Sequence, residues 1–165
     1  MVESQFREAL TMQVPNANIR SSSYYIAEMQ ARCAKCGRQS RVFALGVPPN
    51  HEIHVDVEWQ NIDGNAFIFY VAELPDAVNR RLFGRSPAFR LQRGQDPADS
   101  HWVNHCEHCA EPISDEELHC EPGGFMPSRV EEAEAISLSH IDESFSAHAA
   151  GYALAPEFFA SMRRP

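Results

Sequence analysis

The sequence predicts an α+β fold that is mostly antiparallel β-sheet. Two observations lead to this fold class. The chain contains two Cys-x-x-Cys pairs, Cys33–Cys36 and Cys106–Cys109, and its clearest periodicity is the two-residue alternation of β-strands. With 165 residues, the chain has the usual size of one domain, and we predict a single domain over 1–165.

The first cysteine pair is flanked by predicted strands at 24–32 and 41–47. Gly37 directly follows the pair and can adopt the left-handed conformation that such a turn requires. A strand–turn–strand unit of this kind is typical of one half of a zinc ribbon. We place the two halves at about 24–47 and 101–120.

The insertion between the two halves, residues 48–100, is predicted to contain a β-hairpin and a helix. The segment from His51 to Trp59 alternates apolar and polar residues, and turn-forming residues separate it from an apolar run, Ala66 to Ala72. We expect these two strands to pair with each other. A short helix is expected to begin at Pro75 and to end near Gly84, followed by an exposed loop.

The two ends of the chain give weaker patterns. The C-terminal part, 129–163, is expected to contain one strand at about Val130 to Ile141 and a short helix that begins near Pro156. Near the other end, a short helical patch is expected at Ser4 to Leu10.

The sequence shows no sign of export or membrane insertion. Its longest apolar run, Ala66 to Ala72, is far shorter than the roughly 18 residues of a membrane helix. The first residues, MVESQFREAL, lack the basic start and apolar run of a secretory signal. We therefore expect a cytoplasmic protein, in which the five cysteines stay free of disulfides because the compartment is reducing.

The paired cysteines suit one tetrahedral zinc ion, Zn2+, with four thiolate ligands at about 2.3 Å: Cys33, Cys36, Cys106 and Cys109. The spacing is unusual, because 69 residues separate the two pairs whereas compact sites have about 15–20. The alternatives are a site with a histidine in place of one thiol, two unrelated turns, or a redox pair. A redox pair would begin a helix, whereas the residues after Cys36 are typical of a turn and a strand.

The segment 101–120 is rich in histidine as well as cysteine. This density permits a catalytic metal with an open coordination position and Glu107 or Glu117 as the base. We favour a closed structural site with the histidines beside it or at the surface, and we do not predict an enzyme. The residues that could still contribute to the metal site are His105, His108, His119 and Cys120.

Three residues near the second pair have alternative interpretations. The side-chain amide of Asn104 can orient a loop or bond a thiolate, or it can face solvent. Trp102 is expected to pack in the core rather than to anchor a partner. Cys120 can also be a small buried residue without a ligand role.

The charges are unevenly distributed along the chain. The net charge of −9 at pH 7 argues against broad binding to phosphate backbones. Residues 77–93 contain only basic charges, whereas 107–146 contains eleven carboxylates and a single arginine, Arg129. The arginines of the first segment form a candidate partner surface: Arg80, Arg81, Arg85, Arg90 and Arg93. The alternative, which we favour, is that basic and acidic regions pair within the molecule.

The second cysteine pair resembles a known pattern. Residues 101–109, HWVNHCEHC, with Leu118-His119 and then Glu121-Pro122-Gly123-Gly124 behind them, are similar to a group of uncharacterised bacterial zinc-ribbon proteins. In that group the second turn reads roughly Tyr-Trp-x-Asn-x-Cys-x-x-Cys-Gly, and Ala110 stands here in place of the glycine. The resemblance implies zinc at the four paired cysteines and carries no known activity.

These observations predict a small cytosolic bacterial zinc-ribbon protein that acts as an interaction module or inhibitor-like accessory protein. Its partner is expected to be a macromolecule, and a protein rather than a nucleic acid. The alternative is a nucleic-acid-binding zinc ribbon that uses the arginine-rich surface. A metal-dependent hydrolase is the third possibility.

Overall fold

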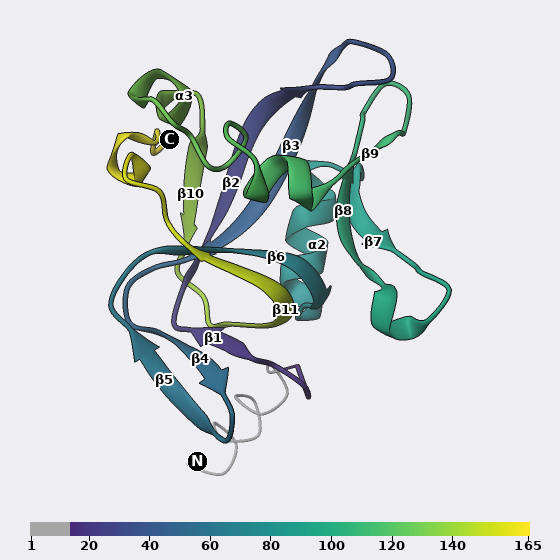
Figure 1. The fold of residues 1–165 in the computed structure, drawn as a ribbon. Helices are drawn as coiled ribbons and strands as arrows, with labels where there is room; N and C mark the ends of the chain where they lie inside the picture. The colour runs from purple at the N-terminus through teal and green to yellow at the C-terminus, as the bar shows by residue number, and fades with distance from the viewer. Residues whose placement is uncertain (1–13) are drawn as a thin grey trace.

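A computed structural model describes residues 14–165, and its main body is an eight-stranded antiparallel sheet with the order β10-β2-β3-β6-β11-β1-β4-β5 (Figure 1). A second sheet has the order β7-β8-β9 and is also antiparallel. The predicted α+β class with mostly antiparallel β-structure is confirmed. Within the described residues, the helices are too short to span a membrane.

The larger sheet consists of β1 (Ile19–Ser21), β2 (Tyr24–Arg32), β3 (Gln39–Val47), β4 (His51–Val55), β5 (Glu58–Ile62), β6 (Ala66–Glu73), β10 (Ser137–Ile141) and β11 (Phe145–Leu154). The smaller sheet consists of β7 (Phe89–Gln92), β8 (His101–His105) and β9 (Pro112–Ile113). The helices are α2 (Asp76–Arg85) and α3 (Val130–Glu134), and the short turns are 3₁₀ at Pro97–Asp99 and Phe159–Ser161 and π-helical at Glu116–Cys120.

The apolar core has two parts that share the central strands. The first part contains Leu45 of β3, Ile68 of β6 and Leu82 of α2, and Trp102 joins it, as the sequence predicted. The second part contains Phe67 of β6 and extends to two of the paired cysteines, Cys33 and Cys106. The cysteine turns are therefore packed against the core of the larger sheet.

The predicted pairing of His51–Trp59 with Ala66–Ala72 is wrong. The chain turns back at Asp56, where φ is 57°, so that β4 pairs with β5. The sequence hides this turn because the apolar–polar alternation continues through the two turn residues into Trp59. The apolar run instead forms β6, which pairs with β3 and β11.

Three other expectations also need correction. The expected exposed loop after α2 contains β7, and Phe89 in this strand is buried. The expected single strand at Val130–Ile141 is α3 followed by β10. The sequence analysis did not predict β11, a central strand rich in small residues. In this strand, Gly151 lies against the ring of Phe69 without room for a side chain.

The remaining element predictions agree with the structure or fall outside it. The strands around the first cysteine pair are β2 and β3, and the expected helix after Pro75 is α2. The short helix expected after Pro156 is the 3₁₀ turn at Phe159–Ser161. The helical patch expected at Ser4 to Leu10 lies outside the described residues.

Candidate metal centre

The β2–β3 and β8–β9 connections bring four cysteine sulfurs together. The Sγ atoms of Cys33, Cys36, Cys106 and Cys109 all lie within 4.8 Å of one another. Between the two pairs, the Sγ of Cys33 lies 3.6 Å from that of Cys109, and the Sγ of Cys36 lies 3.7 Å from that of Cys106. Four thiolates at about 2.3 Å from a tetrahedral zinc ion would be roughly 3.8 Å apart. These distances fit the ion, and the structure brings the two pairs together as predicted, so that the four cysteines could hold one metal ion.

Both cysteine turns have the same backbone geometry. The Gly37 N–H donates to the Cys33 carbonyl, and the Ala110 N–H donates to the Cys106 carbonyl, each at 2.9 Å. The residue after the second cysteine is left-handed in both turns, with φ of 75° at Gly37 and 64° at Ala110. Ala110 therefore adopts the conformation for which glycine is better suited, without changing the turn.

The thiols of the second turn have unequal pKa values. Although burial disfavours the thiolate, backbone N–H groups of Cys109 and His108 lower the pKa of Cys106 to about 6; the His108 nitrogen is 3.4 Å from its sulfur. The Glu111 N–H acts in the same direction on Cys109, but burial and the adjacent thiols raise its pKa to about 11. Since metal ligation requires thiolates, binding of an ion would release the remaining protons.

Ion pairs connect the two turns beside the sulfurs. The Arg41 guanidinium contacts both carboxylate oxygens of Glu107, at 3.0 and 3.1 Å, and this hydrogen bonding lowers the pKa of Glu107. The Lys35 ammonium is 3.3 Å from Glu111. The Glu107 N–H also donates to the Ser40 hydroxyl at 2.9 Å. The basic first turn and the acidic second turn therefore pair with each other within the molecule.

Asn104 joins β8 to β3 by a pair of side-chain hydrogen bonds. Its Oδ1 accepts from the Phe43 N–H at 2.8 Å, and its Nδ2 donates to the Phe43 carbonyl at 2.9 Å. β3 pairs with β6 only over Leu45–Val47, so Phe43 has no β6 partner. The Asn104 side chain takes the place of that strand and is 1 % exposed. The interpretation of Asn104 as a solvent-facing residue is wrong.

Two histidines beside the second cysteine pair serve as hydrogen-bonding residues. His105 is buried, and its Nδ1 lies 3.1 Å from the Ala88 carbonyl at the start of β7. The Nε2 of His108 lies 2.9 Å from the carbonyl of Gln39, at the start of β3. Within residues 14–165, the metal-binding group consists of cysteines alone.

His119 and Cys120 also lie outside the cysteine cluster. The imidazole of His119 stacks on Phe69 and Phe125, with ring centroids 4.7 and 5.3 Å apart, and burial lowers its pKa to about 4. Its Nδ1 is buried without a hydrogen-bond partner among the described residues. Cys120 is exposed, which corrects its interpretation as a small buried residue.

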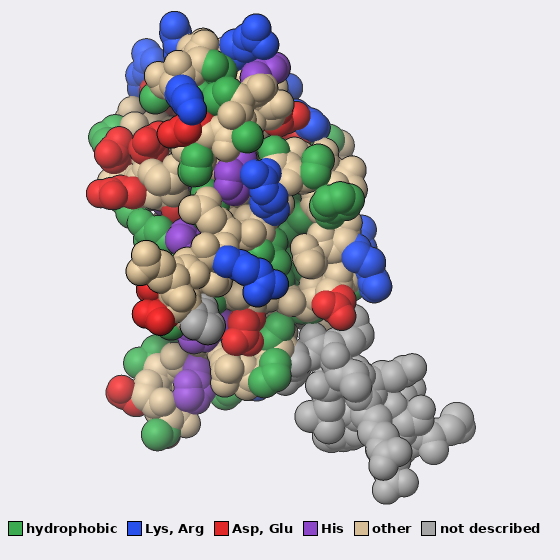
Figure 2. Space-filling model, turned by 90° about the vertical axis from the view of Figure 1, so that its right-hand side faces the viewer, with side chains coloured by type: hydrophobic (Ala, Val, Ile, Leu, Met, Phe, Trp, Pro, Cys, Tyr) green, Lys and Arg blue, Asp and Glu red, His purple; other side chains and the backbone are tan. Residues whose placement is uncertain are grey.

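The arginines of the candidate partner surface differ in their contacts. Arg81 contacts both carboxylate oxygens of Glu143 at 2.8 Å, and Arg85 lies 3.3 Å from the Ser139 hydroxyl. The other three arginines are exposed: Arg80, Arg90 and Arg93. Figure 2 shows basic side chains spread over the face that includes the smaller sheet, with acidic side chains between them.

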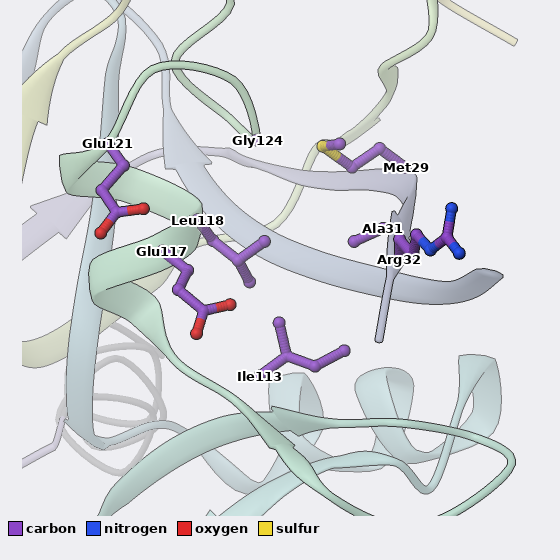
Figure 3. A pocket seen from close by; sticks show the side chains of 8 residues that line it. All are labelled: Met29, Ala31, Arg32, Ile113, Glu117, Leu118, Glu121 and Gly124. Carbon is purple, nitrogen blue, oxygen red and sulfur yellow. The ribbon is translucent and has the colours of Figure 1, made fainter. Parts of the chain in front are cut away.

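An open pocket of about 450 Å³ lies beside the metal centre (Figure 3). Its walls come from the end of β2, from β9 and from the π-helical turn with the segment that follows it. The lining residues are Met29, Ala31, Arg32, Ile113, Glu117, Leu118, Glu121 and Gly124. No sequence pattern indicated this pocket, because its walls are far apart in the chain.

Comparison with known proteins identifies no relative of this chain: no family model, curated protein or solved structure matches it. The similarity to bacterial zinc-ribbon proteins therefore remains a resemblance carried by the residues around the second cysteine pair.

Proposed function

We propose that the protein is a zinc-stabilised module that binds another protein. The observation that carries this proposal is the donor set of the metal centre, which consists of four thiols with the separation that tetrahedral zinc requires. Sites of four cysteines are typical of structural zinc, and four thiolates fill a tetrahedral shell. The resemblance to bacterial zinc-ribbon proteins agrees with this assignment.

The bound ion would fix two elements that are distant in sequence. Cys33 and Cys36 follow β2, whereas Cys106 and Cys109 follow β8 of the smaller sheet. Structural zinc can contribute on the order of 10 kcal/mol or more to folding. Together with the Asn104 side chain, the ion would hold the smaller sheet against β3. The surface around the two cysteine turns would then have a defined shape.

A protein partner is supported by the charge and the lining of that surface. The chain has a net charge of −9, and the pocket beside the cysteines combines apolar side chains with carboxylates. A phosphate backbone would be repelled there. The pairing of Arg81 with Glu143 also removes one cation from the surface that a nucleic acid would use.

A second candidate function is nucleic-acid binding. It is favoured by the exposure of Arg80 and of Phe83, which is 66 % exposed; the two side chains line one shallow hollow. An arginine next to an exposed aromatic ring can bind and stack on a single strand.

The two functions are separated by binding assays on the zinc-loaded chain. We expect one specific protein to be captured by the tagged wild-type chain under native conditions, with no salt-sensitive retention on heparin or mixed-sequence oligonucleotides. Capture should be lost in Cys33→Ser, because loss of zinc would disorder the two cysteine turns and the surface around them. Salt-sensitive oligonucleotide binding without a protein partner would contradict the proposal and support the second candidate.

A further inference from the structure

The pocket beside the metal centre has an apolar middle and charged ends. Figure 3 shows Ile113 and Leu118 between the carboxylates of Glu117 and Glu121 on one side and Arg32 on the other. The Arg32 guanidinium is directed away from the two carboxylates. Ile113 and Leu118 are largely buried, so they form a fixed floor.

The two carboxylates at the pocket differ from several other acidic residues of the chain. Glu107, Glu111 and Glu132 each have an arginine or lysine partner. Glu117 and Glu121 are exposed and form no ion pair within residues 14–165. A cation that enters the pocket would therefore not have to displace another from these two carboxylates.

The backbone around the pocket holds its walls in place. Arg32 immediately precedes Cys33, so the metal centre fixes one wall. On the acidic side, Gly124 has a φ of 55°, and a Cβ there would lie 2.6 Å from the Leu118 carbonyl oxygen. The Phe125 N–H donates to that oxygen at 2.8 Å. The chain after Glu121 is therefore packed tightly against the π-helical turn.

We propose that this pocket binds the side chain of a lysine or arginine that a partner protein presents. The inference rests on the proposed function, and it names the chemistry of the contact. The aliphatic stem of such a side chain would pack on Ile113 and Leu118, and its cation would meet Glu117 and Glu121. Arg32, at the other end, can pair with a carboxylate or a backbone carbonyl of the same segment. A free polyamine shares the cation and stem but offers nothing to Arg32.

The test uses the zinc-loaded full chain and two short peptides, Ac-Ala-Arg-Ala-NH2 and its glutamine analogue, in an NMR titration. We expect the arginine peptide to shift the backbone resonances of Ile113, Leu118 and Gly124 in a saturable and salt-sensitive way. The glutamine peptide should leave them in place. The double variant Glu117→Gln/Glu121→Gln should weaken binding by about tenfold, which is in the range for two exposed ion pairs.

A matched control is Glu131→Gln/Glu134→Gln, which removes the same charge from exposed positions of α3, outside the pocket lining. We expect this variant to bind the arginine peptide as the wild type does. Equal losses in the two variants would show a general attraction to an acidic surface and would overturn the inference. If spermidine shifts the same resonances and binds more tightly than the peptide, the ligand is a free polyamine. That result would overturn the inference that a partner protein presents the cation.

The result also separates this inference from the proposed function. If the tagged chain captures a protein partner but the arginine peptide does not bind the pocket, the inference fails and the proposed function stands. If the peptide binds the pocket but no protein is captured, the proposed function fails and the partner assignment fails with it.

Discussion

Replacement of Asn104 by alanine should destabilise the protein far more than the loss of one polar side chain at the surface. The side chain is 1 % exposed and supplies both hydrogen-bond partners of the Phe43 backbone, at 2.8 and 2.9 Å. Phe43 is itself 2 % exposed, so its N–H and carbonyl would be left without partners. Each unsatisfied group costs roughly 1–3 kcal/mol, which gives roughly 2–6 kcal/mol for the pair.

The assay is urea unfolding of the zinc-loaded wild type and Asn104→Ala, with Asn79→Ala as the control. Asn79 is exposed on α2, so its removal should change the free energy of unfolding by no more than about 0.5 kcal/mol. The Asn104→Ala variant should keep its zinc. Within residues 14–165, the side chain of Asn104 hydrogen-bonds to the Phe43 backbone and to no cysteine sulfur. If Asn104→Ala loses less than about 1 kcal/mol, this residue does not serve as the partner of β3.

The remaining predictions concern charged and titratable residues. His119 has its pKa lowered to about 4 by burial, so the folded chain binds fewer protons and loses stability as pH falls from about 6.5 to 4. Relative to His119→Phe, this loss should reach about 3 kcal/mol in pH-dependent unfolding, and equal pH profiles would contradict it. The pKa of Glu107 is lowered by hydrogen bonding to Arg41, so its stabilisation should disappear as pH falls below the ordinary value of 4.5. Glu107→Gln should show a smaller loss than the wild type in the same acid titration; an unchanged curve would count against the pair. Arg81→Gln removes the exposed pair with Glu143 and should lower the free energy of unfolding by no more than about 1 kcal/mol, whereas loss of folding would assign it a structural role.

The sequence was most informative where local spacing determines the chemistry. Two Cys-x-x-Cys pairs predict two similar turns, and the strands next to the first pair follow from their residue pattern. The turn at Asp56 could not be located in this way, because the apolar–polar alternation continues through it. β11 escaped prediction because alanine, serine and glycine weaken its apolar signal, although it lies in the middle of the sheet.

The role of Asn104 and the pocket depend on contacts between distant segments. Asn104 becomes a substitute for a strand only because β6 ends its pairing with β3 before Phe43. The pocket forms where the end of β2 meets the π-helical turn. Neither local sequence indicates that these two segments lie side by side. The charge pattern was more informative. It predicted that basic and acidic regions pair within the molecule, and the ion pairs Arg41–Glu107 and Lys35–Glu111 join the two turns in this way.

The central claim is that four cysteines hold one structural zinc ion and that Cys120 does not take part. Native mass spectrometry with thiol titration tests it on the wild type, Cys109→Ser and Cys120→Ser. We predict one zinc per chain in the wild type and in Cys120→Ser, none in Cys109→Ser, and a single reactive thiol in the native wild type, that of the exposed Cys120. Zinc that persists in Cys109→Ser, or that is lost in Cys120→Ser, would contradict the assignment of the metal centre.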